Sequence, residues 1–120
     1  MKGLFNKTRR RQLCSRIVYC RNLFSQGTGL TFRPKKSVDD CAWIFIFNEP
    51  RIVSLTMAFV FFPIDALFLD GNKRIVEIKQ DFKPWQLYFP TGRCSYVIEL
   101  KNKTVKSSGT RVGDLLEFIE

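Results

Sequence analysis

The stretch LTMAFVFFPIDALFL, residues 55–69, decides how the chain folds. It contains a single charged residue, Asp65, and Pro63 divides it into two short apolar runs. In each run the apolar side chains occupy both alternating positions, which predicts strands that are buried on both faces. A third run of the same kind covers residues 41–47. We therefore predict that these three segments form the centre of a β structure.

Turn signals separate this centre from further short strands. Asp70-Gly71-Asn72 is typical of a hairpin turn, and residues 75–79 after it alternate apolar and polar side chains. Further strands are predicted at residues 13–19, 95–100, from Val105 and at 115–119. The pattern predicts an all-β fold of about eight short, mostly antiparallel strands, either a small sandwich or a closed barrel. One or two short helical turns are expected, one of them over residues 22–28.

The positive charge is concentrated in the N-terminal third. The chain has 20 Lys and Arg residues against 11 Asp and Glu, a net charge of +9, and no acid precedes Asp39. We predict a basic, loosely docked arm over residues 1–12, followed by a single β domain over residues 13–120. Such a segment either contacts RNA or another polyanion or is a solvated tail. The candidate polyanion-binding residues are Lys7, Arg9, Arg10 and Arg11.

The cysteine pattern and the absence of histidine limit the chemistry. The four cysteines are Cys14, Cys20, Cys41 and Cys94. None forms a Cys-x-x-Cys pair, so a structural zinc site would need all of them to converge. The sequence therefore indicates no metal and no cofactor, and it favours free buried thiols over disulfides. No catalytic residue is assigned, because a histidine base is absent and no serine or cysteine lies in a nucleophile motif.

Targeting signals are not evident. The basic start is not followed by a long apolar run, as a secretory signal would be. The most apolar stretch, residues 52–62, is too short to span a bilayer and is ended by Pro63 and Asp65. We therefore predict a cytoplasmic protein without a transmembrane segment.

Residues 57–69 resemble a segment of a known family. Members of the domain-of-unknown-function 192 family carry a methionine, an aromatic run, Pro-Ile-Asp or Pro-Leu-Asp, and then a strand, and the chain looks like the archaeal form. Other matching motifs are Gly29-Leu30-Thr31-Phe32-Arg33, Lys83-Pro84-Trp85, Tyr96-Val97-Ile98-Glu99-Leu100 and Val112-Gly113-Asp114. Gln26 replaces a frequent arginine of the family, and residues 101–103 replace its Pro-x-Gly turn. The resemblance implies an all-β fold of this size and no assigned activity.

Asp65 is the most informative single residue, because it is the only acid among apolar strands. A carboxylate in such a place needs a partner or hydrogen bonds. One interpretation is that Asp65 caps backbone amides or pairs with an arginine. The other is that it anchors a ligand at the floor of a pocket. For the second interpretation, the resemblance names Met57, Arg33 and Trp85 as neighbours.

Three functions follow from these observations. The first is a non-catalytic binding domain that holds a small or extended ligand around Asp65. The second is an RNA- or polyanion-binding module that uses the basic N-terminal residues. The third is a carboxylate-dependent hydrolase in which Asp65 acts with Glu77 or Asp81. Aromatic residues near Trp85 either cover one end of the fold or stack on sugars or bases.

Overall fold

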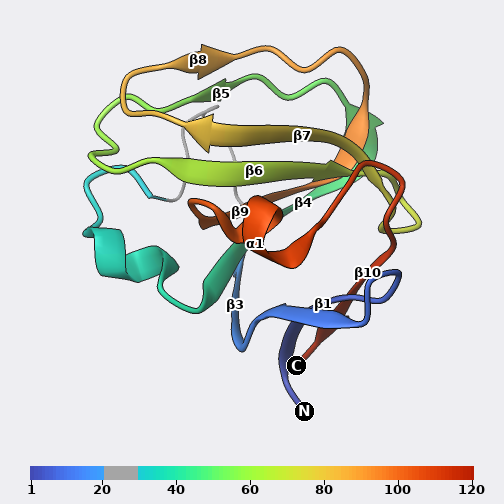
Figure 1. Ribbon diagram of the computed structural model, residues 1–120. Helices are drawn as coiled ribbons and strands as arrows, with labels where there is room; N and C mark the ends of the chain where they lie inside the picture. Colours follow the sequence, from blue (N-terminus) through green and yellow to red (C-terminus); the bar gives the residue numbers. More distant parts are fainter. Residues whose placement is uncertain (21–29) are drawn as a thin grey trace.

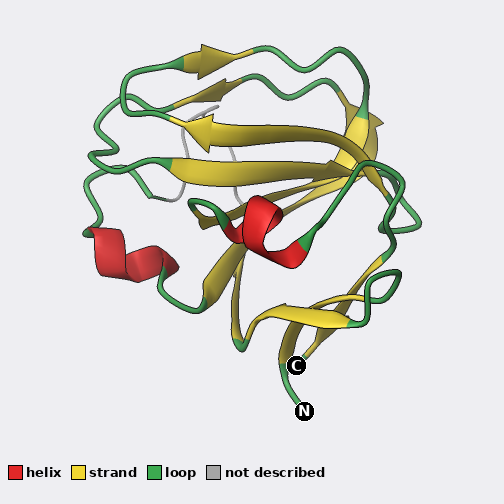
Figure 2. Cartoon of the chain, in the orientation of Figure 1, coloured by secondary structure: helices red, strands yellow, loops and turns green. Residues whose placement is uncertain are grey.

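The computed structural model describes residues 1–20 and 30–120, and most of the described elements are strands (Figure 1, Figure 2). The central layer is a five-stranded sheet in the order β3-β4-β9-β6-β7. Its strands are β3 (Arg16–Cys20), β4 (Cys41–Arg51), β9 (Cys94–Lys101), β6 (Ile64–Leu69) and β7 (Ile75–Phe82). β3 and β4 are parallel, and the other neighbours are antiparallel. The predicted all-β class is confirmed. In the described part of the chain this sheet is open, with β3 and β7 at its edges.

The centre of the sheet is buried on both faces, as the apolar runs of β4 and β6 predict. One face, which carries Trp43 and Phe68, packs against loops and a two-stranded sheet. That small sheet pairs β5 (Leu55–Thr56) with β8 (Leu87–Tyr88). The opposite face carries Ile44 and Leu67 and packs against a short helix and a three-stranded sheet. These elements are α1 (Thr104–Ser108), β1 (Gly3–Asn6), β2 (Arg11–Cys14) and β10 (Leu116–Ile119).

The N-terminal residues form part of the fold, so the prediction of an arm over residues 1–12 is wrong. β1 lies between β2 and β10, and its Gly3 is the register partner of Ile119. Leu4 is completely buried in the core. At Gly3 the φ angle is +125°, and an added Cβ would lie 2.0 Å from the carbonyl oxygen of Cys14, so only glycine allows this close approach. The basic composition of the segment concealed its apolar contribution to the core.

Residues 55–62, predicted as a central strand, are mostly irregular. Only the two residues of β5 pair with another strand. After them, the carbonyl oxygen of Met57 accepts hydrogen bonds from the amides of Val60 (3.1 Å) and Trp85 (3.0 Å). These bonds turn the chain, and Phe59 and Phe61 are 44% and 61% exposed. The loop therefore places on the surface two rings that the alternation had assigned to the interior.

Three smaller differences concern element boundaries. The strand predicted over residues 13–19 is divided at Ser15 between β2 and β3. The strand predicted from Val105 is helix α1, and the predicted loop 33–40 contains a 3₁₀ turn, η1 (Lys35–Val38). The helical turn predicted over residues 22–28 lies outside the described residues.

Candidate functional site

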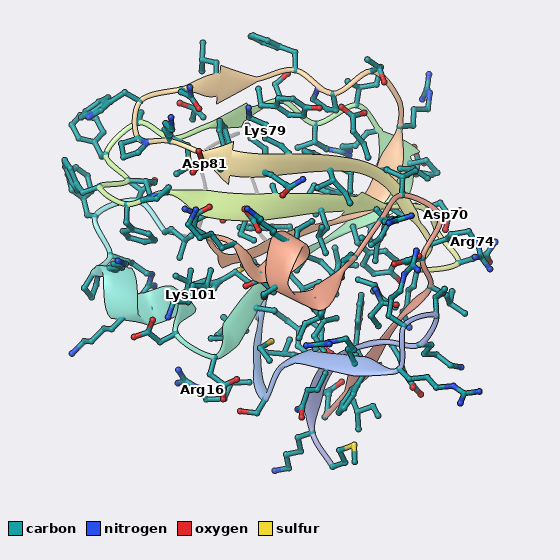
Figure 3. All side chains as sticks on the ribbon, in the orientation of Figure 1. Arg16, Asp70, Arg74, Lys79, Asp81 and Lys101 are labelled. Atoms are coloured by element: carbon teal, nitrogen blue, oxygen red, sulfur yellow. The ribbon has the colours of Figure 1, made fainter. Side chains whose placement is uncertain are left out.

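Asp65 is buried, and the backbone occupies its carboxylate. The residue is 1% exposed. Its Oδ1 accepts a hydrogen bond from the amide of Asp81 and its Oδ2 accepts one from the amide of Val105, each at 3.0 Å. Asp81 lies near the end of β7 (Figure 3), where the pairing with β6 is irregular, and Val105 lies in the first turn of α1. The residue before α1, Lys103, makes no side-chain cap, so Asp65 supplies that bond from the sheet.

Asp65 therefore has the geometry of the first interpretation, a cap for backbone amides. It joins an irregular strand end and a helix start to the middle of the central sheet. With both oxygens bonded and almost no exposed surface, the carboxylate does not form an open floor for a ligand.

The candidate carboxylates Asp65, Glu77 and Asp81 have different hydrogen-bond and ion-pair partners. Glu77 accepts hydrogen bonds from the hydroxyl of Tyr88 and from the amide of Thr91, the latter at 3.0 Å. Burial and the bond to Glu77 raise the pKa of Tyr88 to about 12. The side chain of Asp81 points elsewhere, to Lys83 at 3.7 Å. Each acid is thus engaged in holding a different loop or strand.

Met57 and Trp85 are joined by a backbone hydrogen bond, but their side chains have different environments. The Met57 side chain is completely buried, while Trp85 is 57% exposed. The amide of Met57 donates to the carbonyl of Gln86 at 2.9 Å, and its carbonyl accepts from the amide of Trp85 at 3.0 Å. Met57 therefore supports the loop that presents the indole ring of Trp85, and its own side chain is not open to a ligand.

Four exposed aromatic rings gather at this end of the molecule, and we call Phe32, Phe59, Phe61 and Trp85 the aromatic surface. Phe32 stacks on Phe59 with ring centroids 4.8 Å apart. Trp85 meets Phe59 edge-on at 4.9 Å and Phe61 edge-on at 6.1 Å. The rings come from three loops. The amide of Phe32 donates to the carbonyl of Phe59 (2.8 Å), and the backbone hydrogen bonds of Met57 join the second loop to the Trp85 loop. Sequence reasoning identified only Trp85 among the four.

Three of the four rings are attached to left-handed backbone. The φ angles are +62° at Phe32, +60° at Phe59 and +67° at Trp85. A bulky residue in this region costs about 1–2 kcal/mol relative to ordinary backbone. Such strain persists only where surrounding bonds hold it, and it is concentrated at ligand-binding and active sites. The aromatic surface is therefore a strained, exposed feature that the core does not require.

The strain can be measured at Trp85. We expect Trp85→Gly to be more stable than Trp85→Ala by about 1 kcal/mol, because both remove the indole but only glycine relieves the positive φ. Urea denaturation of the two variants measures the difference. The same pair at Phe61, whose φ is not positive, is the control and should show the opposite order. A Gly variant at position 85 less stable than its Ala counterpart would contradict the strain.

Arg33 lies beside the aromatic surface, directly after Phe32 in the chain. Its guanidinium carbon is 4.8 Å from the centre of the Trp43 ring. Trp43 itself is fixed, since its indole N–H donates to the carbonyl of Ser37 at 2.9 Å. Arg33 is exposed and directly follows Phe32 in the chain, while its guanidinium lies over the Trp43 ring.

Comparisons with known proteins agree with this fold. The DUF192 family, described as "Uncharacterized ACR", matches residues 5–118. The chain belongs to the DUF192 family. A UPF0127 protein of Thermococcus sibiricus is 29% identical over 117 residues, which are 96% of this chain and 73% of that protein. A UPF0127 protein of Pyrococcus furiosus is also 29% identical, over 96% of this chain and 97% of its own length.

A solved structure shows the same architecture. The crystal structure of a candidate transcription regulator from Sinorhizobium meliloti is 28% identical in sequence and superposes with a TM-score of 0.76. The match covers 85% of this chain and 80% of that one. The family match over residues 5–118 confirms the predicted resemblance to the DUF192 family, and the solved structure shows that the fold occurs in another protein.

In this DUF192 chain the basic N-terminal residues lie away from the aromatic surface. β1, β10 and the termini are at the bottom of Figure 1, whereas β5 and β8, which adjoin the aromatic surface, are at the top. Arg9 forms two hydrogen bonds with Asp114, from Nε at 3.0 Å and from Nη2 at 3.1 Å. Although burial opposes it, these bonds and one from Asn6 hold the pKa of Asp114 below its usual value.

The other three basic candidates remain exposed. Lys7, Arg10 and Arg11 line a cavity of about 460 Å³ together with Phe5 and Glu117. We call Lys7, Arg10 and Arg11 the basic face. Of the four predicted polyanion-binding residues, Arg9 therefore has a structural partner, and the other three are exposed at the cavity.

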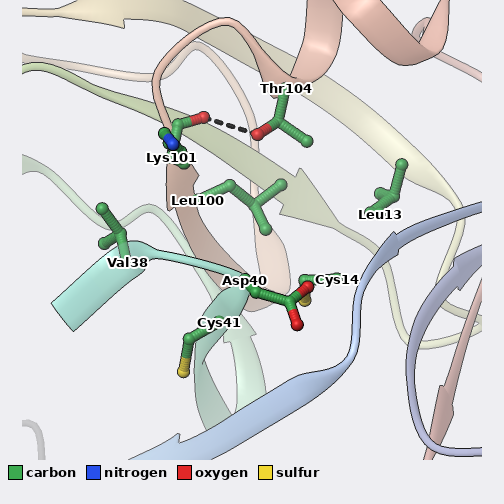
Figure 4. Close-up of a pocket in the computed structure, with 8 residues that line it drawn as sticks. All are labelled: Leu13, Cys14, Val38, Asp40, Cys41, Leu100, Lys101 and Thr104. Atoms are coloured by element: carbon green, nitrogen blue, oxygen red, sulfur yellow. Dashed lines mark hydrogen bonds between the residues drawn. The ribbon is translucent and has the colours of Figure 1, made fainter. Parts of the chain in front are cut away.

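A smaller cavity of about 220 Å³ lies between β2, β4 and β9 (Figure 4). Its polar lining is already engaged: Asp40 accepts bonds from the amide and hydroxyl of Ser15, and the Lys101 ammonium is 3.5 Å from Asp39.

All four cysteines carry free thiols. Across residues 1–20 and 30–120, no three acidic, cysteine or histidine side chains are grouped as metal ligands. None of the described helices has the length and hydropathy needed to cross a membrane.

Proposed function

We propose that this protein is a non-catalytic binding domain whose contact surface is the aromatic surface. The observation that carries the proposal is a row of four exposed rings in mutual contact, three of them on left-handed backbone. Exposed apolar patches on soluble proteins mark interaction sites, since they cost solubility without stabilising the fold. Backbone strain at three of these residues also indicates an interaction site, because strained backbone is concentrated at such sites.

This proposal moves the site from the interior to the surface and gives Asp65 a positioning role. Asp65 bonds the amide of Asp81, two residues before Lys83 and four before Trp85. The buried carboxylate therefore fixes the strand end from which the Trp85 loop departs. Met57 holds the other side of that loop, and Arg33 flanks the rings.

Tryptophan fluorescence tests the proposal. The chain has two tryptophans, and Trp43 is 7% exposed, so a Trp43→Phe background leaves Trp85 as the only reporter. We expect at least one of three probe classes, a nucleoside monophosphate, a disaccharide or a short apolar peptide, to change Trp85 emission. Phe61→Ser should weaken that response, because stacking on a ring contributes about 1–3 kcal/mol.

The control is Val76→Ser, which removes an exposed apolar side chain from β7 and should leave the response intact. If no probe class changes Trp85 emission, or if Phe61→Ser leaves the response unaltered, the aromatic surface is not a binding site.

A second candidate function is polyanion binding at the basic face. It is favoured by the cavity that Lys7, Arg10 and Arg11 line and by the net charge of +9. Glu117 lines the same cavity and opposes an anion there. Oligonucleotide binding by variants of the basic face and of the aromatic surface separates this candidate from the first.

A further inference from the structure

The segments that carry the aromatic surface also carry exposed cations. The rings belong to residues 30–36, 57–63 and 82–89, and these segments contain no Asp or Glu. Their exposed cations are Arg33, Lys35, Lys36 and Lys83. Asp81, just outside the third segment, is 3.7 Å from Lys83, and both side chains are more than half exposed. A surface pair of this kind is weak and opens readily.

We infer that the aromatic surface binds single-stranded nucleic acid, with bases stacked on the rings and phosphates next to the flanking cations. The inference rests on the proposed function and names its ligand. Proteins that bind single strands combine exposed rings, on which any base stacks, with cations that follow the phosphates. Both components occur together here, in loops that backbone hydrogen bonds join into one unit.

Charge distinguishes a single strand from other ligands with flat or apolar faces. An apolar peptide would use the rings but would gain nothing from four cations. A neutral sugar needs polar side chains beside the rings, and the Oε1 acceptor of Gln86 is already used by the amide of Lys83 at 2.9 Å. A duplex offers phosphates but keeps its bases paired and away from the rings. A single strand uses both features of the surface.

The rings at the ends of the row have the largest accessible area for stacking. Phe32 is 70% exposed and Phe61 is 61% exposed, whereas Phe59 between them is 44% exposed. Arg33 follows Phe32 and Lys83 precedes Trp85 by two residues, so two of the three segments that carry the rings also carry a cation close to a ring in the chain. A strand stacked on the rings would bring its phosphates toward these positively charged segments.

Fluorescence anisotropy of the full chain with 5′-labelled oligo(dT) of about 12 nucleotides tests the inference. The double variant Phe61→Ser/Trp85→Ser should bind at least roughly tenfold more weakly, because it removes two rings on which bases stack. Arg33→Gln/Lys83→Gln should lower the slope of log K against log salt concentration by about 1.4, since each phosphate contact to a single strand contributes about 0.7.

The matched control is Lys7→Gln/Arg10→Gln, which removes the same charge from the basic face. It should leave the salt slope almost unchanged, and circular dichroism should show that all variants keep the fold. All substituted side chains are exposed, so none of the variants removes a core residue.

The outcomes separate the two proposals. If oligo(dT) does not bind but a disaccharide or a peptide changes Trp85 emission, the ligand class is wrong and the binding surface remains. If neither oligo(dT) nor any probe binds, both proposals fail. If the Lys7/Arg10 variant lowers the slope while the ring variant binds normally, the strand contacts the basic face and the inference is overturned. Equal affinity for a duplex of the same length would also overturn it.

Discussion

Asp65→Ala is expected to lower the free energy of unfolding by roughly 2–4 kcal/mol, because it leaves one buried and one partly buried amide without an acceptor, at about 1–3 kcal/mol for the buried one and less for the other. Those amides belong to Asp81 and Val105, each 3.0 Å from a carboxylate oxygen. Urea denaturation measures the loss. Hydrogen exchange should show that the same two amides lose protection before the centre of the sheet does.

Asp39→Ala is the control for this variant. Asp39 forms a surface ion pair with Lys101 at 3.5 Å, and both side chains are 55% exposed. Its removal should therefore change stability by less than about 1 kcal/mol. If Asp65→Ala were as mild as this control, or if the amides of Asp81 and Val105 stayed protected, Asp65 would not be the cap that the structure shows.

Glu99→Gln is expected to stabilise the protein increasingly as the pH rises toward 8. Glu99 lies in β9 between Trp43 and Ala66, it is completely buried, and no described residue forms a hydrogen bond with either carboxylate oxygen. Burial raises the pKa of this carboxyl from 4.5 to about 8. The folded protein therefore keeps the proton on Glu99 where the unfolded chain has released it.

The sign of the effect follows from this difference. Below about pH 4.5 the carboxyl is protonated in both states, and no penalty arises. Between pH 4.5 and about 8 the folded state binds more protons, so the free energy of unfolding falls as the pH rises. At about 1.4 kcal/mol per pKa unit, the fall is on the order of 4 kcal/mol.

Urea denaturation of both proteins at several pH values tests this prediction. The chain has no histidine, so the difference between wild type and Glu99→Gln should be dominated by Glu99 between about pH 5 and pH 8. Parallel stability curves for the two proteins would show that Glu99 has the same pKa in the folded and unfolded states.

The sequence was sufficient to predict the elements that depend on local alternation. Apolar residues at both parities predicted that β4 and β6 would be central, and Asp65 was recognised as a carboxylate that needs partners. The partners themselves, the amides of Asp81 and Val105, lie 16 and 40 residues away, and no local pattern indicates them. The sheet formed by β1 and β10 is still less local, because it pairs Gly3 with Ile119.

The aromatic surface could not be predicted because a phenylalanine in an apolar run has the same pattern whether it faces the core or a ligand. Phe59 and Phe61 are directed outward by the two hydrogen bonds to the Met57 carbonyl, one of which comes from Trp85. Glu99 shows the opposite case, a polar residue that local alternation does not identify as buried. In β9 the apolar side chains of Tyr96, Ile98 and Leu100 occupy alternating positions, so alternation alone places Glu99 on the outer face. A second layer covers that face and buries Glu99.

The pairing of β1 with β10 also determines where a label, a solid support or a fused domain attached to a chain end will lie. Because Gly3 and Ile119 are partners, the two ends of the chain lie side by side, and a short peptide could connect them into a ring. A fluorophore, a solid support or a fused domain fixed at either end would sit next to the basic face. The loops that present the exposed rings would then stay unobstructed in solution.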